Sequence, residues 1–306
     1  MGRLVLDHCP FLDEHFFFDE RTKLSEQLRL MRTLRERHFD VVIDFMNNPR
    51  SALYTWVSGG TERVAFASAR RPAYSRIVPK GPPGRYIVQD KFDLMEAAGF
   101  ARPTDERLVL PWFEVHTQPF MRLWAENPAF KEATVRVVLS PTHRRIARRW
   151  PLASYAALAE RLVNDWGAAV VWLWGPGEEA EIDAAMALTK VPTIKAPKTT
   201  FREMAALIAN MHLFIGNSNG PSHVAVAGGI CSLQLHGHTD ARAWCPMTAE
   251  HQALQSPEFG KDLGRLARID LISVDEVWGK LGEMRPVIDG FRGSLRAQRP
   301  RLVWHG

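Results

Sequence analysis

The chain has 306 residues, of which 46% are hydrophobic and 24% charged, so its composition predicts a folded globule and excludes a disordered chain. Its length allows two domains of ordinary size. No apolar run approaches the roughly 20 residues of a membrane helix, and the N-terminus lacks the basic-then-apolar pattern of a secretion signal.

Cysteine usage and charge narrow the class of protein further. Cys9, Cys231 and Cys245 are an odd number at unrelated spacings without a CxxC pair, which favours a reducing cytosol over a disulfide framework or a structural zinc site. The net charge is +5 and the isoelectric point about 9.3. A basic surface attracts nucleotide phosphates, lipid head groups or nucleic acid, and charge alone does not separate these.

The first third of the chain predicts short elements separated by irregular stretches. Residues 23–37 carry leucines at helical spacing and predict an amphipathic helix, and VVIDF at 41–45 is typical of a buried parallel strand. Residues 67–85 are rich in Arg, Pro and Gly and predict a loop, and residues 101–117 predict a linker between domains. The other predicted elements are strands at 4–6, 15–18 and 63–66 and helices at 51–57 and 86–98.

Beyond residue 134, strands and helices alternate, which predicts a parallel sheet with helices on both faces. Thr200 with Glu203 and Ser273 with Glu276 have the spacing of helix capping boxes. The predicted strands are 135–139, 169–174, 193–195, 212–215 and 230–235, and the predicted helices are 120–124, 152–166, 178–188, 200–209 and 273–281.

The stretch 212–240 predicts a strand, a glycine turn, a helix and a second strand. The turn, residues 216–221, lies at the carboxyl end of the first strand, and Pro221 suits the first helical turn. Backbone N–H groups at such a helix start can hold a phosphate, helped by the helix dipole. The alternative is an ordinary crossover without a ligand.

Four ordered segments carry a family resemblance. GNSNGPSHVAVAGG followed by LHGHTDARAWCP resembles the C-terminal signature of glycosyltransferase family 9, the heptosyltransferase-like enzymes of lipopolysaccharide assembly. HFDVVIDFMNNPRSAL with the later RVAF resembles a block of the family's N-terminal domain. RRWPLASYAALAERL and WLWGPGEEAEI resemble two blocks of its C-terminal domain. The resemblance extends from about residue 4 to about residue 285.

The resemblance implies an α/β fold of the GT-B type, with two Rossmann-like domains whose parallel sheets face a cleft. Residues 1–117 would form an incomplete acceptor-side domain, and residues 118–306 the nucleotide-sugar-binding domain. The implied reaction is transfer of heptose from ADP-heptose to a lipopolysaccharide core or related glycan, with inversion at the anomeric centre. The implied setting is the cytoplasm, with peripheral contact at the inner membrane surface and no nucleic acid partner.

No cofactor or metal ion is expected. The chain has no Asp-x-Asp pair, which a metal-dependent transferase would need for its diphosphate. In the family a Lys two residues before a Trp meets the donor's phosphates, and that position is Arg148 here. The alternative for Arg144, Arg145, Arg148 and Arg149 is a solvated, basic helix start.

The resemblance assigns Glu178 to the ribose, and the alternative is a helix N-terminal acid favoured by the dipole. Ser218 stands where the family has an Asp that contacts the donor sugar, so this change bears on sugar choice and activity, and Asn219 stands where Thr or Ser is usual. His223 has two interpretations, phosphate contact or packing beneath the turn. The implied donor-binding residues are Ser140, Thr142, Arg148, Trp174, Glu178, Ser218, Asn219, Gly220, Pro221 and His223.

On the acceptor side the resemblance points to Asn48 and Arg50, which either hold their loop or touch an acidic acceptor. The basic residues of the 63–80 region either meet an anionic lipid surface or belong to a solvated loop.

The catalytic residue is unknown at this stage. Family members carry their base, an Asp, in a strand–loop–helix–strand unit that precedes the segment resembling LVLDHCPFLDE at 4–14. Asp13 and Asp44 are the nearby carboxylates that could substitute. We therefore expect an exposed edge in the N-terminal sheet and a poor catalyst, unless the natural protein is longer. The alternative function is a catalytically impaired nucleotide-sugar or glycan-binding protein, and a nucleic-acid binder rests on the isoelectric point alone.

Overall fold

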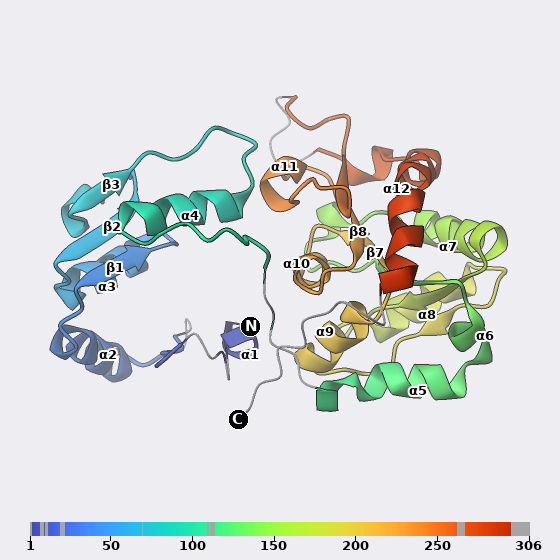
Figure 1. Cartoon of the computed structure of the whole chain (residues 1–306), viewed down its shortest axis with the longest axis horizontal. Coiled ribbons are helices and arrows are strands. Elements are labelled where there is room, and N and C mark those ends of the chain that lie inside the picture. The colour runs from blue at the N-terminus through green and yellow to red at the C-terminus, as the bar shows by residue number, and fades with distance from the viewer. Residues whose placement is uncertain are drawn as a thin grey trace. The chain divides into compact units, whose positions relative to one another are not determined.

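A computed structural model describes residues 2–6, 9, 12–18, 22–68, 70–108, 110, 114–261 and 267–294 (Figure 1). The chain forms two compact units, Met1–Glu106 and Arg107–Gly306. The boundary between them lies inside the stretch 101–117 that was expected to link two domains. Each unit is an α/β structure with one parallel sheet.

Unit 1 is built on a three-stranded parallel sheet in the order β1-β2-β3. The middle strand alternates its side chains between two small cores, because Val64 and Phe66 pack with Leu94 of α4 while Ala65 packs with Ala52 of α3. The elements of this unit are α1 (Gly2–Leu6), α2 (Leu24–Glu36), β1 (Val41–Asp44), α3 (Pro49–Ser58), β2 (Glu62–Phe66), η1 (Arg71–Ala73), β3 (Arg76–Val78) and α4 (Ile87–Ala97).

β1 is an edge strand of this sheet within the described part of the chain, as the sequence led us to expect. A hollow runs along it and is lined by apolar side chains from α2, β1 and α3, among them Leu34, Val42 and Tyr54. Met46 is 74% exposed and Trp56 is 60% exposed, so this part of unit 1 presents large apolar side chains to solvent.

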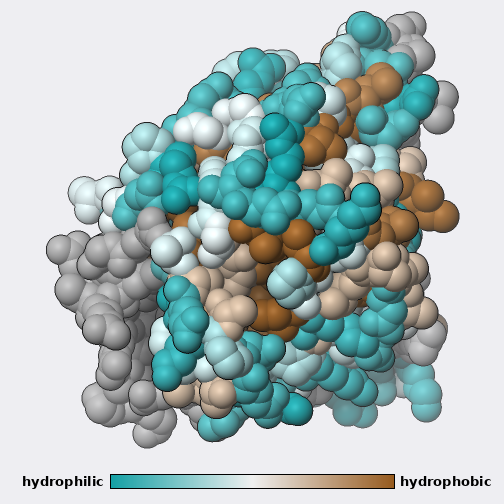
Figure 2. Space-filling view, turned by 90° about the vertical axis from the view of Figure 1, so that its right-hand side faces the viewer, coloured by the Kyte–Doolittle hydropathy of each residue, from teal (hydrophilic) through white to brown (hydrophobic). Residues whose placement is uncertain are grey.

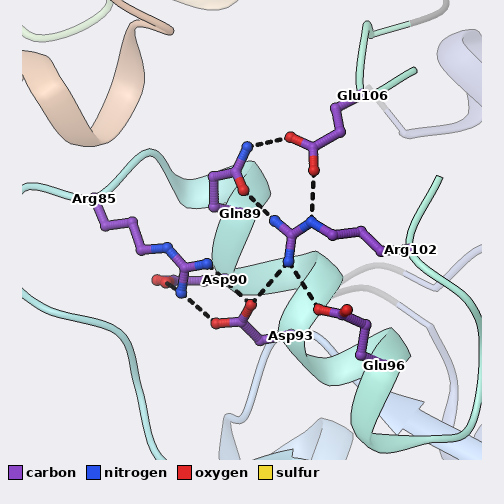
Figure 3. Close-up of polar contacts among 7 residues, drawn as sticks. All are labelled: Arg85, Gln89, Asp90, Asp93, Glu96, Arg102 and Glu106. Carbon is purple, nitrogen blue, oxygen red and sulfur yellow. Dashed lines mark hydrogen bonds and ion pairs between the residues drawn. The ribbon is translucent and has the colours of Figure 1, made fainter. Parts of the chain in front are cut away.

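An ion-pair network explains why unit 1 includes the segment after α4 (Figure 3). Arg102 donates to Glu106 at 2.6 Å, to Glu96 at 2.8 Å and to Asp93 at 3.2 Å. Asp93 also pairs with Arg85, whose hydrogen bonds are the main reason why the pKa of the Asp93 carboxyl lies below its usual range. Arg102 therefore fastens residues 102–106 to α4.

Three predictions for unit 1 were wrong. Residues 4–6 lie in a helix and not in a strand, and residues 15–18 form no strand. Both runs are only three or four residues long, and such short apolar runs do not distinguish the period of a helix from that of a strand. The predicted loop 67–85 contains η1 and the strand β3, whose three residues, RIV, are too few to show a strand period.

Unit 2 contains a six-stranded parallel sheet in the order β6-β5-β4-β7-β8-β9. The chain adds strands outward from β4 to β5 and β6, then returns to the other side of β4 with β7, so the order reverses between β4 and β7. The strands are β4 (Val135–Ser140), β5 (Ala168–Trp172), β6 (Ile194–Lys195), β7 (Leu213–Asn217), β8 (Cys231–His236) and β9 (His251–Gln255).

Helices cover both faces of this sheet (Figure 1). One core contains Leu158 of α7, Ile182 of α8 and Leu281 of α12, and the other contains Leu123 of α5, Phe130 of α6 and Leu207 of α9. The helices are α5 (Gln118–Glu126), α6 (Pro128–Glu132), α7 (Leu152–Trp166), α8 (Glu179–Ala187), α9 (Phe201–Ala209), α10 (Gly220–Ala227), α11 (Ala241–Trp244) and α12 (Val274–Ser294), with 3₁₀ turns η2 (Glu114–Thr117), η3 (Ile146–Arg148) and η5 (Ile269–Leu271).

Most predictions for unit 2 are confirmed, including the capping boxes at Thr200 and Ser273. The prediction missed α6, α11 and β9, and it ended the last helix at 281, whereas α12 continues through Pro286 to Ser294. The face in Figure 2 is mostly hydrophilic, with hydrophobic residues near its middle and toward its right-hand and upper right-hand sides. Over the described residues, no helix is both long and apolar enough to cross a membrane.

Candidate functional site

The reversal of strand order in unit 2 places the loops after β4 and β7 beside each other at the carboxyl edge of the sheet. The turn after β7 leads directly into α10, which begins at Gly220 and has Asn219 as its N-cap. A side chain could not replace the hydrogen of Gly216, because its Cβ would lie 2.9 Å from Cβ of Ser140. The glycine therefore allows β7 and β4 to end in close contact.

Two asparagines of this turn hold the loop that follows β4. Asn219 caps α10 by accepting from the N–H of Ser222, and its amide donates to Oγ of Ser140 and to the carbonyl of Thr142, each at 3.1 Å. Asn217 is fully buried; it donates to the carbonyl of Pro141 at 2.7 Å and accepts from the N–H of Trp150 at 2.9 Å. The segment 140–150 is thereby fixed at both ends.

The four arginines of this segment have different environments. Arg144 and Arg145 are exposed. Arg149 donates to Glu181 at 2.5 Å and to the carbonyl of His143 at 2.6 Å, so its charge is already paired. Arg148, at the end of η3, is half-buried and bonds to Nε2 of His238 through Nε at 3.2 Å and Nη2 at 2.9 Å. Arg148 is thus bonded to a histidine of the loop after β8, whereas Arg149 is paired with a carboxylate.

Glu178 lies in the loop after β5, immediately before α8. Its Oε2 accepts from the hydroxyl of Thr142 at 2.7 Å and from the N–H of Gly175 at 2.8 Å. Gly177 has a φ of 84°, a conformation that suits glycine and closes this turn. Trp174 donates its indole N–H to the carbonyl of Ala196 at 2.7 Å.

Several of the residues expected to bind the sugar donor are buried and bond to other residues of the protein. Ser140 and Thr142 are 2% and 5% exposed, and their hydroxyl groups are bonded to Asn219 and Glu178. Gly220 is exposed, and Ser218, Pro221 and His223 are half-buried. The ring of His223 packs 5.9 Å from that of Trp244, and burial lowers its pKa. This ring contact is the packing that one alternative expects of His223, and its contact with a phosphate stays a prediction.

A second histidine lies below this edge of the sheet. His236 is fully buried at the end of β8, beside Thr239 and Gln234. Burial, with smaller effects from His223 and Arg148, lowers the pKa of His236 to about 4, so it is neutral near pH 7. His143 also has a lowered pKa, chiefly because of burial and then because of Arg148. The positive charge at the carboxyl edge of the sheet therefore comes from arginine side chains and not from these two histidines.

In unit 1, Asn48 holds its loop. Its side chain accepts from the N–H groups of Arg50 and Ser51, which caps α3. The guanidinium of the exposed Arg50 lies 4.8 Å above the ring of Phe18. Of the other basic residues, Arg63 bonds to the carbonyls of Gly60 and Ala73, and Arg70 to that of Asn47. These side chains fasten the 63–80 region to unit 1.

The two nominated carboxylates differ in environment. Asp13 is exposed. Asp44 is 4% exposed, and its oxygens accept from the N–H groups of Met46 and Asn47 and from the hydroxyl groups of Ser51 and Tyr74, at 2.7–2.9 Å. Burial and the contact with Asp44 raise the pKa of Tyr74. Asp44 organises the turn between β1 and α3, in which Asn47 has a φ of 50°.

Sequence reasoning missed His238 as the partner of Arg148 and His236 beneath it, although both belong to the quoted HGHTD segment. It also gave no role to Asn217, which joins three parts of the site. Among the described residues there is no cluster of three His, Cys, Asp or Glu side chains that could bind a metal ion. The arrangement instead offers oriented N–H donors, arginine side chains and a carboxylate, which suits a nucleoside diphosphate.

Solved structures share this fold. The family 9 glycosyl transferase from Veillonella parvula has a TM-score of 0.76 and 19% identity, with 93% of this chain and 86% of that chain covered. The Escherichia coli heptosyltransferase WaaC with ADP-2-deoxy-2-fluoro heptose has a TM-score of 0.60 and 18% identity, covering 85% and 76% of the two chains. The fold is therefore that of GT-B glycosyltransferases, with a Rossmann-like α/β architecture.

The sequence profile of glycosyltransferase family 9 (heptosyltransferase) matches residues 27–269. A curated relative, lipopolysaccharide heptosyltransferase 3 of Escherichia coli, is 35% identical over 264 residues, covering 79% of this chain and 76% of the relative. The same-named protein of strain K12 is 27% identical, with 74% and 67% covered. The chain belongs to glycosyltransferase family 9 and is a heptosyltransferase-like glycosyltransferase.

Proposed function

We propose that the protein transfers a heptose from ADP-heptose to a lipopolysaccharide core or a related glycan acceptor, inverting the anomeric centre without a metal ion. The curated relatives carry the name lipopolysaccharide heptosyltransferase 3, and a structural neighbour is described with an ADP-heptose analogue. The observation that carries the proposal is the placement of Arg148 and the start of α10 at the strand-order reversal of unit 2.

In this proposal the donor's diphosphate lies against the N-terminus of α10 and Arg148, and Glu178 accepts hydrogen bonds from the ribose through its carboxylate. The acceptor hydroxyl loses its proton to a carboxylate base and attacks the anomeric carbon. The bond from that carbon to the diphosphate oxygen breaks, and ADP leaves with the added charge. Arg148 and the helix N-terminus stabilise that charge, which is greatest in the transition state.

A second candidate function, a nucleotide-sugar-binding protein with little catalysis, is favoured by the environment of Asp44. A base must have a lone pair available for the acceptor's proton, whereas the Asp44 carboxylate is buried and accepts four hydrogen bonds. Ser218, in place of an acidic residue at the turn, also removes a charged contact to a sugar. This alternative predicts donor binding without turnover.

Release of ADP tests the proposal directly. The protein is incubated with ADP-heptose and a heptose-deficient lipopolysaccharide acceptor, and parallel reactions omit the acceptor or contain UDP-, GDP- or CDP-sugars. Acceptor-dependent ADP release supports transfer, and from Asp44 we expect a rate below about 1 per second. A thermal shift with ADP-heptose but no ADP release supports the binding protein. Absence of both signals with ADP-heptose contradicts the donor assignment.

Contact with the cytoplasmic face of an inner membrane is also part of the proposal, and its support is the basic character of the chain, with a net charge of +5. Co-flotation with vesicles that contain anionic lipid, and none with neutral vesicles, is the expected result. Equal flotation with both would contradict an electrostatic membrane contact.

A further inference from the structure

A hollow of about 510 Å³ lies at the amino edge of the sheet in unit 1, where α2 and α3 end and β2 begins. Its volume is within the range of about 300–1,000 Å³ that is usual for small-molecule sites. The residues expected on the acceptor side follow β1 at the opposite, carboxyl edge, so this hollow is a separate feature. It is lined by Arg35, Trp56, Val57, Gly59 and Arg63.

Arg63, the second residue of β2, is fixed in this hollow by neutral groups. Its Nη1 donates to the carbonyl of Gly60 at 2.6 Å, and its Nε donates to that of Ala73 at 3.0 Å. Nη2 has no acceptor within the described part of the chain, and the carboxylate of Glu62 is paired with Arg76 at 2.8 Å. The carbonyls thus hold the guanidinium without adding a negative charge, and Nη2 can donate to a ligand.

Arg35 lies over the end of α3. Gly59 is the C-cap of that helix, with a φ of 65°, and a Cβ there would overlap Nη1 of Arg35. The glycine therefore allows the guanidinium to occupy this place. Arg37, two residues later, pairs with Glu14 at 2.6 Å, whereas Arg35 pairs with no carboxylate of the described residues.

Trp56 adds flat apolar surface beside these two cations. It lies in the last turn of α3 and is 60% exposed, although tryptophan is highly buried on average. The faces of sugar rings carry C–H groups that pack well on an indole. Among the residues that the structure describes, no carboxylate lines the hollow. The hollow thus combines an exposed aromatic face with positive charge.

We propose that this hollow binds a sugar phosphomonoester, with the phosphate between Arg35 and Arg63 and the sugar ring against Trp56. A phosphate monoester carries a charge of about −1.5 to −2 near pH 7, which two guanidinium groups match. Arginine also donates to phosphate oxygens in pairs. The ligand is either a free sugar phosphate or a phosphorylated residue of a glycan. The site takes no part in sugar transfer, so it does not depend on the proposed function.

A purely structural role for the two arginines is the alternative. The C-terminus of α3 carries a partial negative charge, which nearby cations complement. This role needs the positive charge of Arg35 and Arg63 but has no use for the exposed ring of Trp56. It predicts that removal of Arg35 lowers stability and leaves any affinity for sugar phosphates unchanged.

NMR of the Trp56 indole N–H tests the proposal, with glucose 6-phosphate, glucose and inorganic phosphate as probes. The signal of Trp56 is assigned by its loss in Trp56→Leu. We expect glucose 6-phosphate to shift this signal and to bind more tightly than inorganic phosphate. Glucose should not bind in the same concentration range, because it lacks the charge that the arginines attract.

Arg35→Ala should weaken the binding of glucose 6-phosphate about three- to tenfold, the scale of one net hydrogen bond. Trp56→Leu should lower the affinity to that for inorganic phosphate. Arg29→Ala is the matched control, because it removes another exposed arginine of α2 that does not line the hollow. Arg148→Ala controls for binding at the nucleotide site of unit 2. Neither control should change the affinity, and urea denaturation compares the stability of all variants.

A phosphorylated oligosaccharide and its phosphatase-treated form distinguish the two sources of the ligand. Tighter binding of the phosphorylated oligosaccharide than of glucose 6-phosphate assigns the site to a glycan, and the reverse order assigns it to a free sugar phosphate. Either order supports the site, provided that phosphatase treatment abolishes binding of the oligosaccharide.

Four outcomes would overturn the proposal. Equal affinity for inorganic phosphate and glucose 6-phosphate, or an unshifted Trp56 signal, would remove the contact with the sugar ring. Equal losses in Arg29→Ala and Arg35→Ala would show that general charge governs binding. A loss in Arg148→Ala would place the ligand at the nucleotide site. Lower stability of Arg35→Ala with unchanged affinity would assign Arg35 to the C-terminus of α3.

Discussion

The hydroxyl of Thr142 donates to Oε2 of Glu178 at 2.7 Å, so the loop after β4 is joined to the loop after β5. The same oxygen accepts from the N–H of Gly175. One carboxylate oxygen of Glu178 is thus bonded within the protein. These bonds fix the direction in which the carboxylate faces the proposed ribose. The first prediction follows from this arrangement.

Glu178→Ala should weaken ADP binding by about 1.5 to 3 kcal/mol, the usual contribution of hydrogen bonds to a charged group. The loss should be absent for 2′,3′-dideoxy-ADP, which has no ribose hydroxyl groups to donate. Calorimetry with the two nucleotides makes the comparison. Equal losses for both would show that Glu178 acts by holding the turn after β5 and not by contact with the ribose.

Ser218→Asp should increase the affinity for ADP-heptose and leave the affinity for ADP nearly unchanged. The family resemblance gives the acidic residue at this position a contact with the donor sugar, and Ser218 lies half-buried at the open turn before α10. Titration of both ligands into both proteins decides the point. If the two ligands respond equally, residue 218 acts through the shape of the turn.

Asn219→Ala should destabilise unit 2 by about 1 to 2 kcal/mol, because the helix cap is lost together with the bonds to Ser140 and Thr142. Asn219→Ser is the matched control, because a serine still caps α10 but cannot reach the loop after β4 with an amide. Its stability in urea denaturation should lie between those of the other two proteins. An Asn219→Ser protein as unstable as Asn219→Ala would assign the whole effect to the links with the loop.

Asp44→Asn should lower the stability of unit 1 by about 1 to 3 kcal/mol, since an amide nitrogen would face donors that now meet a carboxylate oxygen. ADP release per folded molecule should stay the same. Asp13→Asn, at an exposed position, should change neither quantity. Normal stability with loss of ADP release in Asp44→Asn would identify Asp44 as the base after all.

Acidification should destabilise unit 2 through His236. Its pKa is about 4 in the folded protein, mainly because of burial, and about 6.5 in an unfolded chain. The unfolded state therefore binds a proton first, so the stability that the neutral ring provides is full above pH 6.5 and is lost as the pH falls toward 4. Between pH 7 and 5 the contribution is about 1 to 2 kcal/mol. His236→Gln should show a smaller slope of unfolding free energy against pH, and an unchanged slope would contradict this assignment.

Much of the fold could be predicted from local pattern. The βαβ unit around the turn 216–221, the caps at Thr200 and Ser273 and the alternation beyond residue 134 all depend on neighbours in sequence. β3 was missed because it has only three residues within a stretch rich in Arg, Pro and Gly, and β9 because HQALQ lacks the continuous apolar run of a buried strand. Its place in the sheet follows from pairing with β8, which the local sequence does not encode.

For the site, the sequence indicated which side chains carry charge but not how that charge is used. Arg148 and Arg149 are adjacent and chemically identical, yet they bond to different distant partners, His238 and Glu181. Asp44 likewise had the residue type of a base, and nothing in the local sequence indicated its bond to Tyr74, 30 residues away. Such long-range contacts arise from tertiary packing and have no periodic signature in the chain.

The strand-order reversal between β4 and β7 has a consequence for folding. Residues 140–150, 178 and 216–221 meet only after parallel strands from distant parts of the chain have paired, so no fragment of the sheet contains the complete nucleotide site. A ligand that requires all of these loops binds the folded sheet and not its parts. Nucleotide at 100 times its Kd would therefore add about 2.7 kcal/mol to the stability of the whole sheet, slowing hydrogen exchange even in strands that never touch it.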